Sequence, residues 1–172
     1  MKTVRVLLGW ALGGLLLSAC SPALDWREVS PDGAGLTLLF PCKPDVETRN
    51  GGAQGALQAP RMGLARCEAA GLSYSLSWAE VADPAQLAPA LAAMRSSLAG
   101  KLQAEVKERQ PLQLSGMTPN AEASVQRLQG RNSTAKLALF NRGTMVYQLL
   151  VMGPRVEEAQ WASFVTAIKL AP

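Results

Sequence analysis

Residues 134–140 read Thr-Ala-Lys-Leu-Ala-Leu-Phe, and residues 144–152 read Thr-Met-Val-Tyr-Gln-Leu-Leu-Val-Met. Apolar side chains occupy both odd and even positions of each segment. Because successive side chains of a strand point to opposite faces, both strands are apolar on both faces and need cover on both. The pair therefore predicts a hairpin, turned at Asn141-Arg142-Gly143, in a sheet that lies between two other layers.

Other strands follow from alternation and from turn residues. Within residues 72–79, leucine and aromatic side chains alternate with serines at 73, 75 and 77, which is typical of a strand with one buried face. Ala70-Gly71 predicts the turn that joins this strand to the preceding one. The further strands are predicted at residues 61–68, at 122–129 and at 35–40, the last of which ends at Pro41.

A first helix is predicted within residues 84–102. Apolar residues recur there at intervals of three and four and so share one helical face: Leu87, Leu91, Met94, Leu98 and Leu102. Asp83 and Pro84 suit the cap and the first helical position. Pro89 lacks a backbone N–H, so the helix either kinks there or begins near it, and its start is left open.

A second helix is predicted over residues 155–167, with Glu157 and Glu158 near its positive end. Its apolar face contains Trp161, Phe164, Val165 and Ile168. The order of strands, helix, strands, helix predicts an α+β fold and not a doubly wound α/β fold. We expect a mainly antiparallel sheet sandwiched between helices on opposite faces, an α/β/α arrangement.

Residues 1–19 have the organisation of a secretory signal peptide. Lys2 and Arg5 precede an apolar run from Val6 to Leu17, and small residues follow. The run is short for a transmembrane helix, which is the weaker interpretation. A plain signal peptide followed by an incidental cysteine is the other alternative.

The end of this segment, Leu17-Ser18-Ala19-Cys20, resembles the bacterial lipobox. The resemblance implies diacylglyceryl transfer to Cys20, cleavage after Ala19, and a further acyl chain such as palmitate on the new amino group. Two or more acyl chains hold a protein stably in a membrane. Residue 21 is Ser and not the Asp that favours retention in the inner membrane. The resemblance therefore implies a lipid anchor in the bacterial outer membrane, facing the periplasm, with the inner membrane as the weaker alternative.

The tether after the lipidation site is short. The tether is residues 20–25, counted from the lipidated Cys20, and five residues lie between Cys20 and Trp26, the first expected structural residue. Five extended residues reach at most about 18 Å. We therefore expect a single domain over residues 26–172 that stays close to the membrane surface.

Two cysteines remain if Cys20 carries lipid. Cys42 and Cys67 are then an even pair in an oxidising compartment, and we expect a disulfide between them. The chain-entropy account gives such a loop about 3.5 kcal/mol of stabilisation. A redox or metal pair is the alternative, but the spacing is not Cys-x-x-Cys and the chain has no histidine to complete a zinc site.

The start of the expected domain carries a further resemblance. Trp26, Ser30-Pro31-Asp32-Gly33 and the strand ending in Phe40-Pro41 are similar to the opening of PsbP-like domains. The segments Phe40-Pro41-Cys42-Lys43-Pro44, Cys67-Glu68 and Gly116-Met117-Thr118-Pro119 look like a group of small proteobacterial lipoproteins of unknown function. The resemblance implies an antiparallel sheet sandwiched by helices, and it transfers no activity.

Composition excludes several classes of function. The absence of histidine removes His-based acid–base catalysis, Ser-His-Asp and Cys-His nucleophiles, and His-ligated metal sites. The net charge is +4, and loss of Lys2 and Arg5 with the signal leaves 15 basic against 13 acidic residues, or +2. That excess is too small to indicate nucleic-acid binding. We expect no catalytic residue, no metal and no cofactor.

Several groups of residues are candidate sites, and a structural interpretation is preferred for each. The basic residues predict either a patch that contacts anionic headgroups or a solvated sheet face: Lys107, Arg109, Arg127 and Arg131. The aromatic residues predict either a ligand pocket or the core: Trp26, Tyr74, Trp78, Tyr147 and Trp161. The carboxylates are interpreted as helix-end or surface charges: Glu105, Glu108, Glu157 and Glu158. Asn132-Ser133-Thr134 matches a glycosylation sequon but is interpreted as a turn.

The loop 115–120, Ser-Gly-Met-Thr-Pro-Asn, is the remaining candidate. Methionine suits adaptable binding surfaces, although Met117 can equally fold back onto the core. We expect a non-enzymatic, membrane-anchored module that binds or supports another envelope protein. The alternative is a carrier of a small ligand in a cleft between sheet and helix, and an enzyme built on carboxylates and hydroxyls is less favoured.

Overall fold

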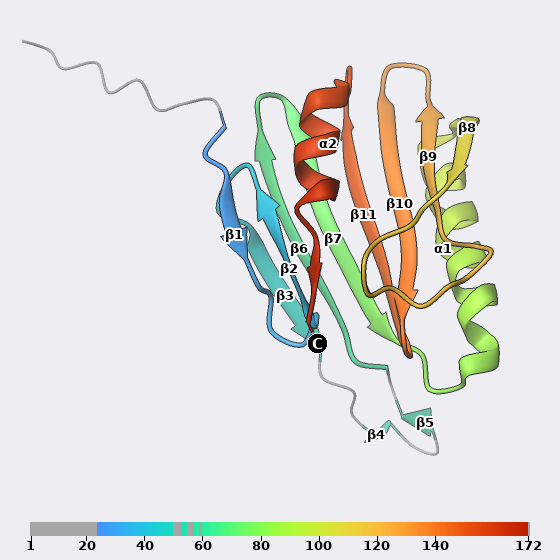
Figure 1. Ribbon diagram of the computed structural model, residues 1–172. Coiled ribbons are helices and arrows are strands. Elements are labelled where there is room, and N and C mark those ends of the chain that lie inside the picture. Colours follow the sequence, from blue (N-terminus) through green and yellow to red (C-terminus); the bar gives the residue numbers. More distant parts are fainter. Residues whose placement is uncertain (1–23, 50–52, 55–56, 59, 172) are drawn as a thin grey trace, which may run out of the picture.

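A computed structural model describes residues 24–49, 53–54, 57–58 and 60–171 (Figure 1). The predicted signal peptide, Cys20 and most of the predicted tether lie outside the described residues. No helix in these ranges is long and apolar enough to cross a membrane.

Seven antiparallel strands form the main sheet. In spatial order they are β3 (Asp45–Arg49), β6 (Met62–Ala69), β7 (Leu72–Glu80), β11 (Met145–Gly153), β10 (Thr134–Arg142), β9 (Ser124–Gln129) and β8 (Glu105–Pro111). A smaller antiparallel sheet has the order β1 (Arg27–Val29), β2 (Leu36–Phe40) and β12 (Lys169–Leu170). The short pair β4 (Ala53–Gln54) and β5 (Leu57–Gln58) lies in the connection from β3 to β6.

Different layers cover the two faces of the main sheet (Figure 1). On one face lie the smaller sheet and α2 (Glu158–Thr166), whose buried residues share a core with the even-numbered residues of β7 and β10. On the other face α1 (Leu87–Leu102) packs Leu91 against Leu137, Leu139 and Val146. We call these the α2 face and the α1 face. The predicted α+β fold, with an antiparallel sheet between helices on opposite faces, is confirmed.

The register explains why β10 and β11 are apolar on both sides. Ala138 and Phe140 point into the core of the α2 face, whereas Leu137 and Leu139 point towards α1. A shift of one residue would exchange these two sets. The hairpin predicted from residues 134–152 therefore forms the centre of the sandwich.

Pro89 lies in the first turn of α1, so the helix begins near this proline. A short 3₁₀ turn, η1 (Pro84–Gln86), is capped by Asp83, whose Oδ1 accepts from the Ala85 N–H at 2.9 Å. The α-helix proper begins at Leu87, so Pro89 lies in its first turn. The backbone N–H groups of a first turn have no partner within the helix, and proline is tolerated there.

Six strands of the described residues were not predicted, the short pair β4 and β5 among them, and the second predicted helix is shorter than expected. β1 and β12 have only three and two residues. β3 and β8 are exposed along their whole length and therefore show no apolar alternation. Residues 155–157 extend α2 in the prediction but precede it in the structure, and β9 begins at Ser124 rather than at residue 122. The strand predicted at 35–40 forms as β2 but belongs to the smaller sheet.

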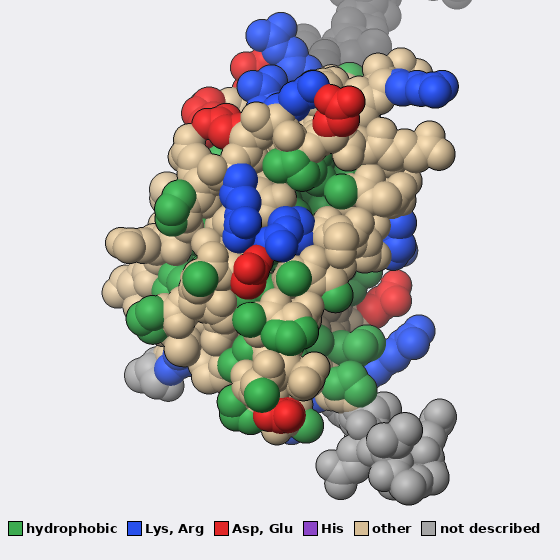
Figure 2. Space-filling view, turned by 90° about the vertical axis from the view of Figure 1, so that its right-hand side faces the viewer, with side chains coloured by type: hydrophobic (Ala, Val, Ile, Leu, Met, Phe, Trp, Pro, Cys, Tyr) green, Lys and Arg blue, Asp and Glu red, His purple; other side chains and the backbone are tan. Residues whose placement is uncertain are grey.

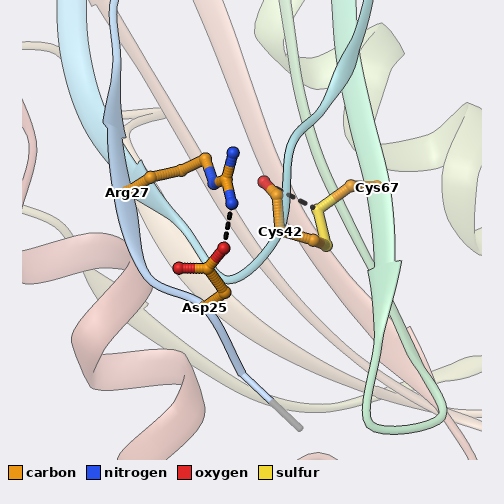
Figure 3. Close-up of a disulfide and its surroundings, with 4 residues drawn as sticks. All are labelled: Asp25, Arg27, Cys42 and Cys67. Atoms are coloured by element: carbon orange, nitrogen blue, oxygen red, sulfur yellow. Dashed lines mark hydrogen bonds and ion pairs between the residues drawn. A yellow bond between two sulfur atoms is a disulfide. The ribbon is translucent and has the colours of Figure 1, made fainter. Parts of the chain in front are cut away.

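The predicted disulfide joins Cys42 to Cys67, with the two Cα atoms 6.1 Å apart. Figure 3 shows it between the segment after β2 and strand β6. Since β2 belongs to the smaller sheet and β6 to the main sheet, the bridge ties the α2-face layer to the sheet that it covers.

One glycine of the main sheet is required by close packing. A Cβ added at Gly63 would lie 2.1 Å from Cζ2 of Trp78, the residue directly opposite it on β7. Such a distance is far below van der Waals contact, and the Trp78 ring is buried. The absent side chain at position 63 therefore makes room for the buried indole ring of Trp78.

Candidate functional site

The candidate aromatic residues mostly form the core. Tyr74, Trp78, Tyr147 and Trp161 are buried in the cluster between the main sheet and the α2-face layer, and Trp26 packs against it. The Tyr147 hydroxyl donates to the Ala34 carbonyl at 2.8 Å, and burial raises the pKa of both tyrosines. The core interpretation is confirmed for these residues, although Trp161 has a second role described below.

The candidate basic residues do not form one patch. Arg127 lies opposite Glu108 and Arg109 opposite Gln126, with a bulge between Val106 and Glu108. Because adjacent positions of β9 point to opposite faces, Arg127 lies on the α2 face and Arg109 on the α1 face. Lys107 pairs with its near neighbour Glu105 at 2.5 Å, which lowers the pKa of that carboxyl through a hydrogen bond and the charge of Lys107. Arg131 lies in the turn after β9.

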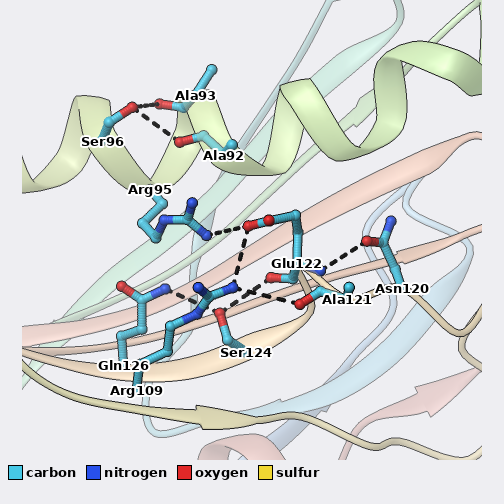
Figure 4. Close-up of polar contacts among 10 residues, drawn as sticks. All are labelled: Ala92, Ala93, Arg95, Ser96, Arg109, Asn120, Ala121, Glu122, Ser124 and Gln126. Atoms are coloured by element: carbon cyan, nitrogen blue, oxygen red, sulfur yellow. Dashed lines mark hydrogen bonds and ion pairs between the residues drawn. The ribbon is translucent and has the colours of Figure 1, made fainter.

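Arg109 belongs instead to an ion-pair network beneath α1 (Figure 4). Glu122 accepts from Arg95 of α1 and, at 3.2 Å, from Arg109 of β8. The hydrogen bond from Arg95 is the main cause that lowers the pKa of the Glu122 carboxyl. Next to it the buried Gln126 amide donates to Ser124 Oγ at 3.0 Å. This network fastens the helix to the edge of the sheet.

The carboxylates also have structural roles. Glu157 is the N-cap residue of α2 and pairs with Arg155 at 2.7 Å, and Glu158 is the first helical residue. Negative charge at this helix end is favourable. The described part of the chain brings no three Cys, Asp or Glu residues together in an arrangement that holds a metal ion.

The sequon Asn132-Ser133-Thr134 forms the turn between β9 and β10, as interpreted. The Gly130 N–H donates to the Ser133 carbonyl at 2.9 Å, and β10 begins at Thr134. The Thr134 hydroxyl accepts from the Val156 N–H at 3.0 Å, which connects this turn to the segment before α2.

The loop between β8 and β9 lines an open groove of about 780 Å³. We call it the loop groove, and its lining is mostly apolar: Pro111, Leu112, Gln113, Leu114, Met117, Pro119, Asn120, Ala121 and Ala123. The loop is held in place by its hydrogen bonds to the β10–β11 hairpin. Asn120 donates to Asn141 Oδ1 at 3.0 Å, and the Gly143 N–H donates to Thr118 Oγ1 at 2.9 Å. The groove is therefore built on a well-anchored loop.

Met117 both packs onto the core and lines a surface, the two roles predicted for it. Its side chain is half-buried and packs against the core, and its sulfur accepts from the Leu114 N–H at 3.2 Å. It also lines the loop groove. The loop predicted as a candidate binding surface thus lines the larger of the two recesses described on the α2 face.

A second recess, of about 330 Å³, lies between α2 and strands β8 to β10. We call it the α2 cleft. Its lining includes four charged side chains and one aromatic ring: Glu108, Arg127, Lys136, Glu158 and Trp161. The ammonium of Lys136 lies 6.0 Å from the centre of the Trp161 ring and pairs with Glu158. Sequence reasoning did not single out Lys136, because one lysine on a strand carries no signal of its own. The opposition of Arg127 and Lys136 becomes visible only from the strand register.

The side of the molecule around α1 and β8 carries charges of both signs. Figure 2 shows this side of the molecule, where basic side chains interspersed with acidic ones lie mainly in the upper half and hydrophobic ones are more frequent below. Mixed charges of this kind are typical of a solvated surface. Lys107 and Arg109 are exposed and pair with Glu105 and Glu122, which agrees with their preferred interpretation as surface charges.

No protein-family model matches the chain, and no curated protein matches it. Among solved structures, a protein from Bacteroides thetaiotaomicron VPI-5482 aligns with 12% sequence identity and a TM-score of 0.32 over 86% of this chain. The alignment spans 42% of that protein's chain, less than half of its length. Function is therefore inferred from the residues of this chain.

Proposed function

We propose that the protein is anchored by lipid at Cys20 in the bacterial outer membrane, faces the periplasm, and acts without catalysis as a binding or accessory module for another envelope protein. Leu17-Ser18-Ala19-Cys20 supports the anchor. β1 begins at Arg27, so only a few residues separate the anchor from the domain. The similarity of the chain to PsbP-like domains and to small proteobacterial lipoproteins stays a prediction.

The loop groove is the observation that carries the binding role. It is wide, open and mostly apolar, and exposed apolar concavities of this kind are frequent at protein–protein contacts. In Figure 1 the loop lies on the right, away from the first described residues of the chain at the upper left. A domain tethered at its beginning would thus leave this groove accessible to a partner.

Site-specific photo-crosslinking in cells tests this role. A photoreactive amino acid replaces the exposed Gln113 in the groove, and a control chain carries it at Ser75, on the α1 face of β7. We expect one envelope protein to crosslink reproducibly at position 113 and not at position 75. Recovery of the same abundant proteins from both positions would contradict the proposal.

A second candidate function is a carrier of a small ligand. The α2 cleft favours it, because its volume of about 330 Å³ is at the small end of the range typical of ligand pockets. It also combines an aromatic wall with convergent charges. The carrier function would use a different recess from the loop groove. The protein could therefore bind a small ligand and an envelope protein at the same time.

A further inference from the structure

A row of charged side chains crosses the main sheet inside the α2 cleft. Glu108 of β8 lies directly opposite Arg127 of β9, and Arg127 lies directly opposite Lys136 of β10. Directly opposed residues of antiparallel strands point to the same face, with Cβ atoms about 5 Å apart. Glu158 of α2 pairs with Lys136 from above the sheet. The order of charges is therefore negative, positive, positive, negative.

The two central cations are incompletely compensated. Like charges placed directly opposite each other destabilise a strand pair. The side chain of Lys136 is only 14% exposed, and its carboxylate partner Glu158 is 76% exposed at the rim. Within the described residues, Arg127 has no carboxylate within 4.0 Å. An anion placed between these two side chains would relieve their repulsion.

The remaining wall of the cleft is aromatic. Trp161 is only 5% exposed, and its ring lies under the Lys136 ammonium. A cation above an aromatic face is held there by the ring's quadrupole, so Lys136 stays within the cleft when its carboxylate partner moves. Trp161 lines the cleft beside Arg127 and Lys136, so an apolar group of a ligand bound there would lie against its ring.

We propose that the α2 cleft binds a small organic monocarboxylate, whose charge lies between Arg127 and Lys136 and whose apolar part lies against Trp161. This inference rests on the second candidate function, the carrier, and names its class of ligand. Glu108 and Glu158 flank the site, and their negative charge disfavours a phosphate or a dicarboxylate. When Glu158 turns away from Lys136, the remaining Glu108, Arg127 and Lys136 carry one net positive charge, which a single carboxylate balances.

The ligand carboxylate would replace Glu158 as the ion-pair partner of Lys136. The Glu158 carboxylate occupies the position on Lys136 that the ligand carboxylate needs, and its exposed side chain can turn into solvent. Removing its charge should therefore strengthen ligand binding. A purely structural ion pair between the helix and the sheet predicts no such gain.

Isothermal titration calorimetry on the purified full chain in detergent tests the proposal, with benzoate, succinate, inorganic phosphate and benzylamine as probes. Binding to the chain is confirmed from the NMR shift of the Trp161 indole N–H. We expect saturable binding of benzoate, at least tenfold weaker in Arg127→Gln because a charge-assisted hydrogen bond is lost, and stronger in Glu158→Gln. The control Arg131→Gln, in the neighbouring turn and outside the cleft lining, should bind like the unmodified chain. Circular dichroism establishes that each variant is folded.

The outcomes separate the inference from the function on which it rests. If succinate, phosphate or benzylamine shifts the Trp161 signal and benzoate does not, the carrier function stands and the monocarboxylate is wrong. If no probe binds at millimolar concentration, both are wrong. Benzoate binding that is unchanged in Arg127→Gln and Glu158→Gln would also overturn the inference.

Discussion

The α2 face and the α1 face of the main sheet are covered in different ways. The cover of the α2 face consists of several short pieces: a small sheet, a nine-residue helix and the loop before β9. The cover of the α1 face over β10 and β11 is one sixteen-residue helix, fastened by Arg95 and Glu122. Both the loop groove and the α2 cleft lie on the α2 face. A cover assembled from short pieces leaves recesses at their borders, where side chains from several elements meet.

The largest effects are expected from truncating the residue that anchors each cover. Phe164 of α2 contacts Phe40 and Tyr74 edge to face, with ring centres 5.2 and 5.5 Å away. Phe164→Ala should cost about 4 kcal/mol of unfolding free energy, and Leu91→Ala in α1 about 3 kcal/mol, measured by urea denaturation. Hydrogen exchange should accelerate in α2 for the first variant alone. Equal acceleration in both helices would show that the two covers are not independent.

The disulfide tests how firmly the α2-face cover is attached. Replacing Cys42 and Cys67 together by alanine should lower the unfolding free energy by about 3.5 kcal/mol, because the unfolded chain gains conformational freedom. Reduction of the unmodified chain should reproduce the loss in the same denaturation experiment. An unmodified chain that is equally stable with and without reductant would contradict a bridge between the two sheets.

The ion pairs of Glu122 give the smallest effect, and it depends on pH. The pKa of this carboxyl is lowered from 4.5 in the folded chain, so its ion pairs stabilise the fold above that pH and lose this contribution as the pH falls through the folded pKa. Glu122→Gln should therefore cost about 1 kcal/mol at pH 7, and this cost should shrink as the pH falls through the folded pKa. A difference between the two chains that stays constant from pH 7 to pH 2 would contradict the role of this charge.

The sequence predicts the elements whose apolar residues repeat with a clear period. The central hairpin, β7 and both helices follow from such repeats, and β6 follows from the turn at Ala70-Gly71. β3 and β8 are exposed throughout, and only their pairing with β6 and β9 makes them strands. A single sequence contains the period of one element but not the partner beside which an exposed strand lies.

The sites divide in the same way. The loop 115–120 is predictable as a candidate surface because Met117 lies near Gly116 and Pro119 in one local segment. The α2 cleft instead takes its lining from three strands and a helix, and each of its charged residues resembles an ordinary surface charge. The alternative of a basic patch that includes Arg109 and Arg127 is wrong for a related reason, because the register and the bulge at Val106 decide which face each residue occupies.

The lipid anchor at Cys20 is the central claim, because the compartment and the proposed role both depend on it. Intact mass spectrometry of the protein extracted from its native membranes tests it directly. The account predicts a chain that begins at Cys20 and carries three acyl chains, with Cys20→Ser released from the membrane fraction. A chain that retains residues 1–19, or one that begins at Cys20 without lipid, would contradict it.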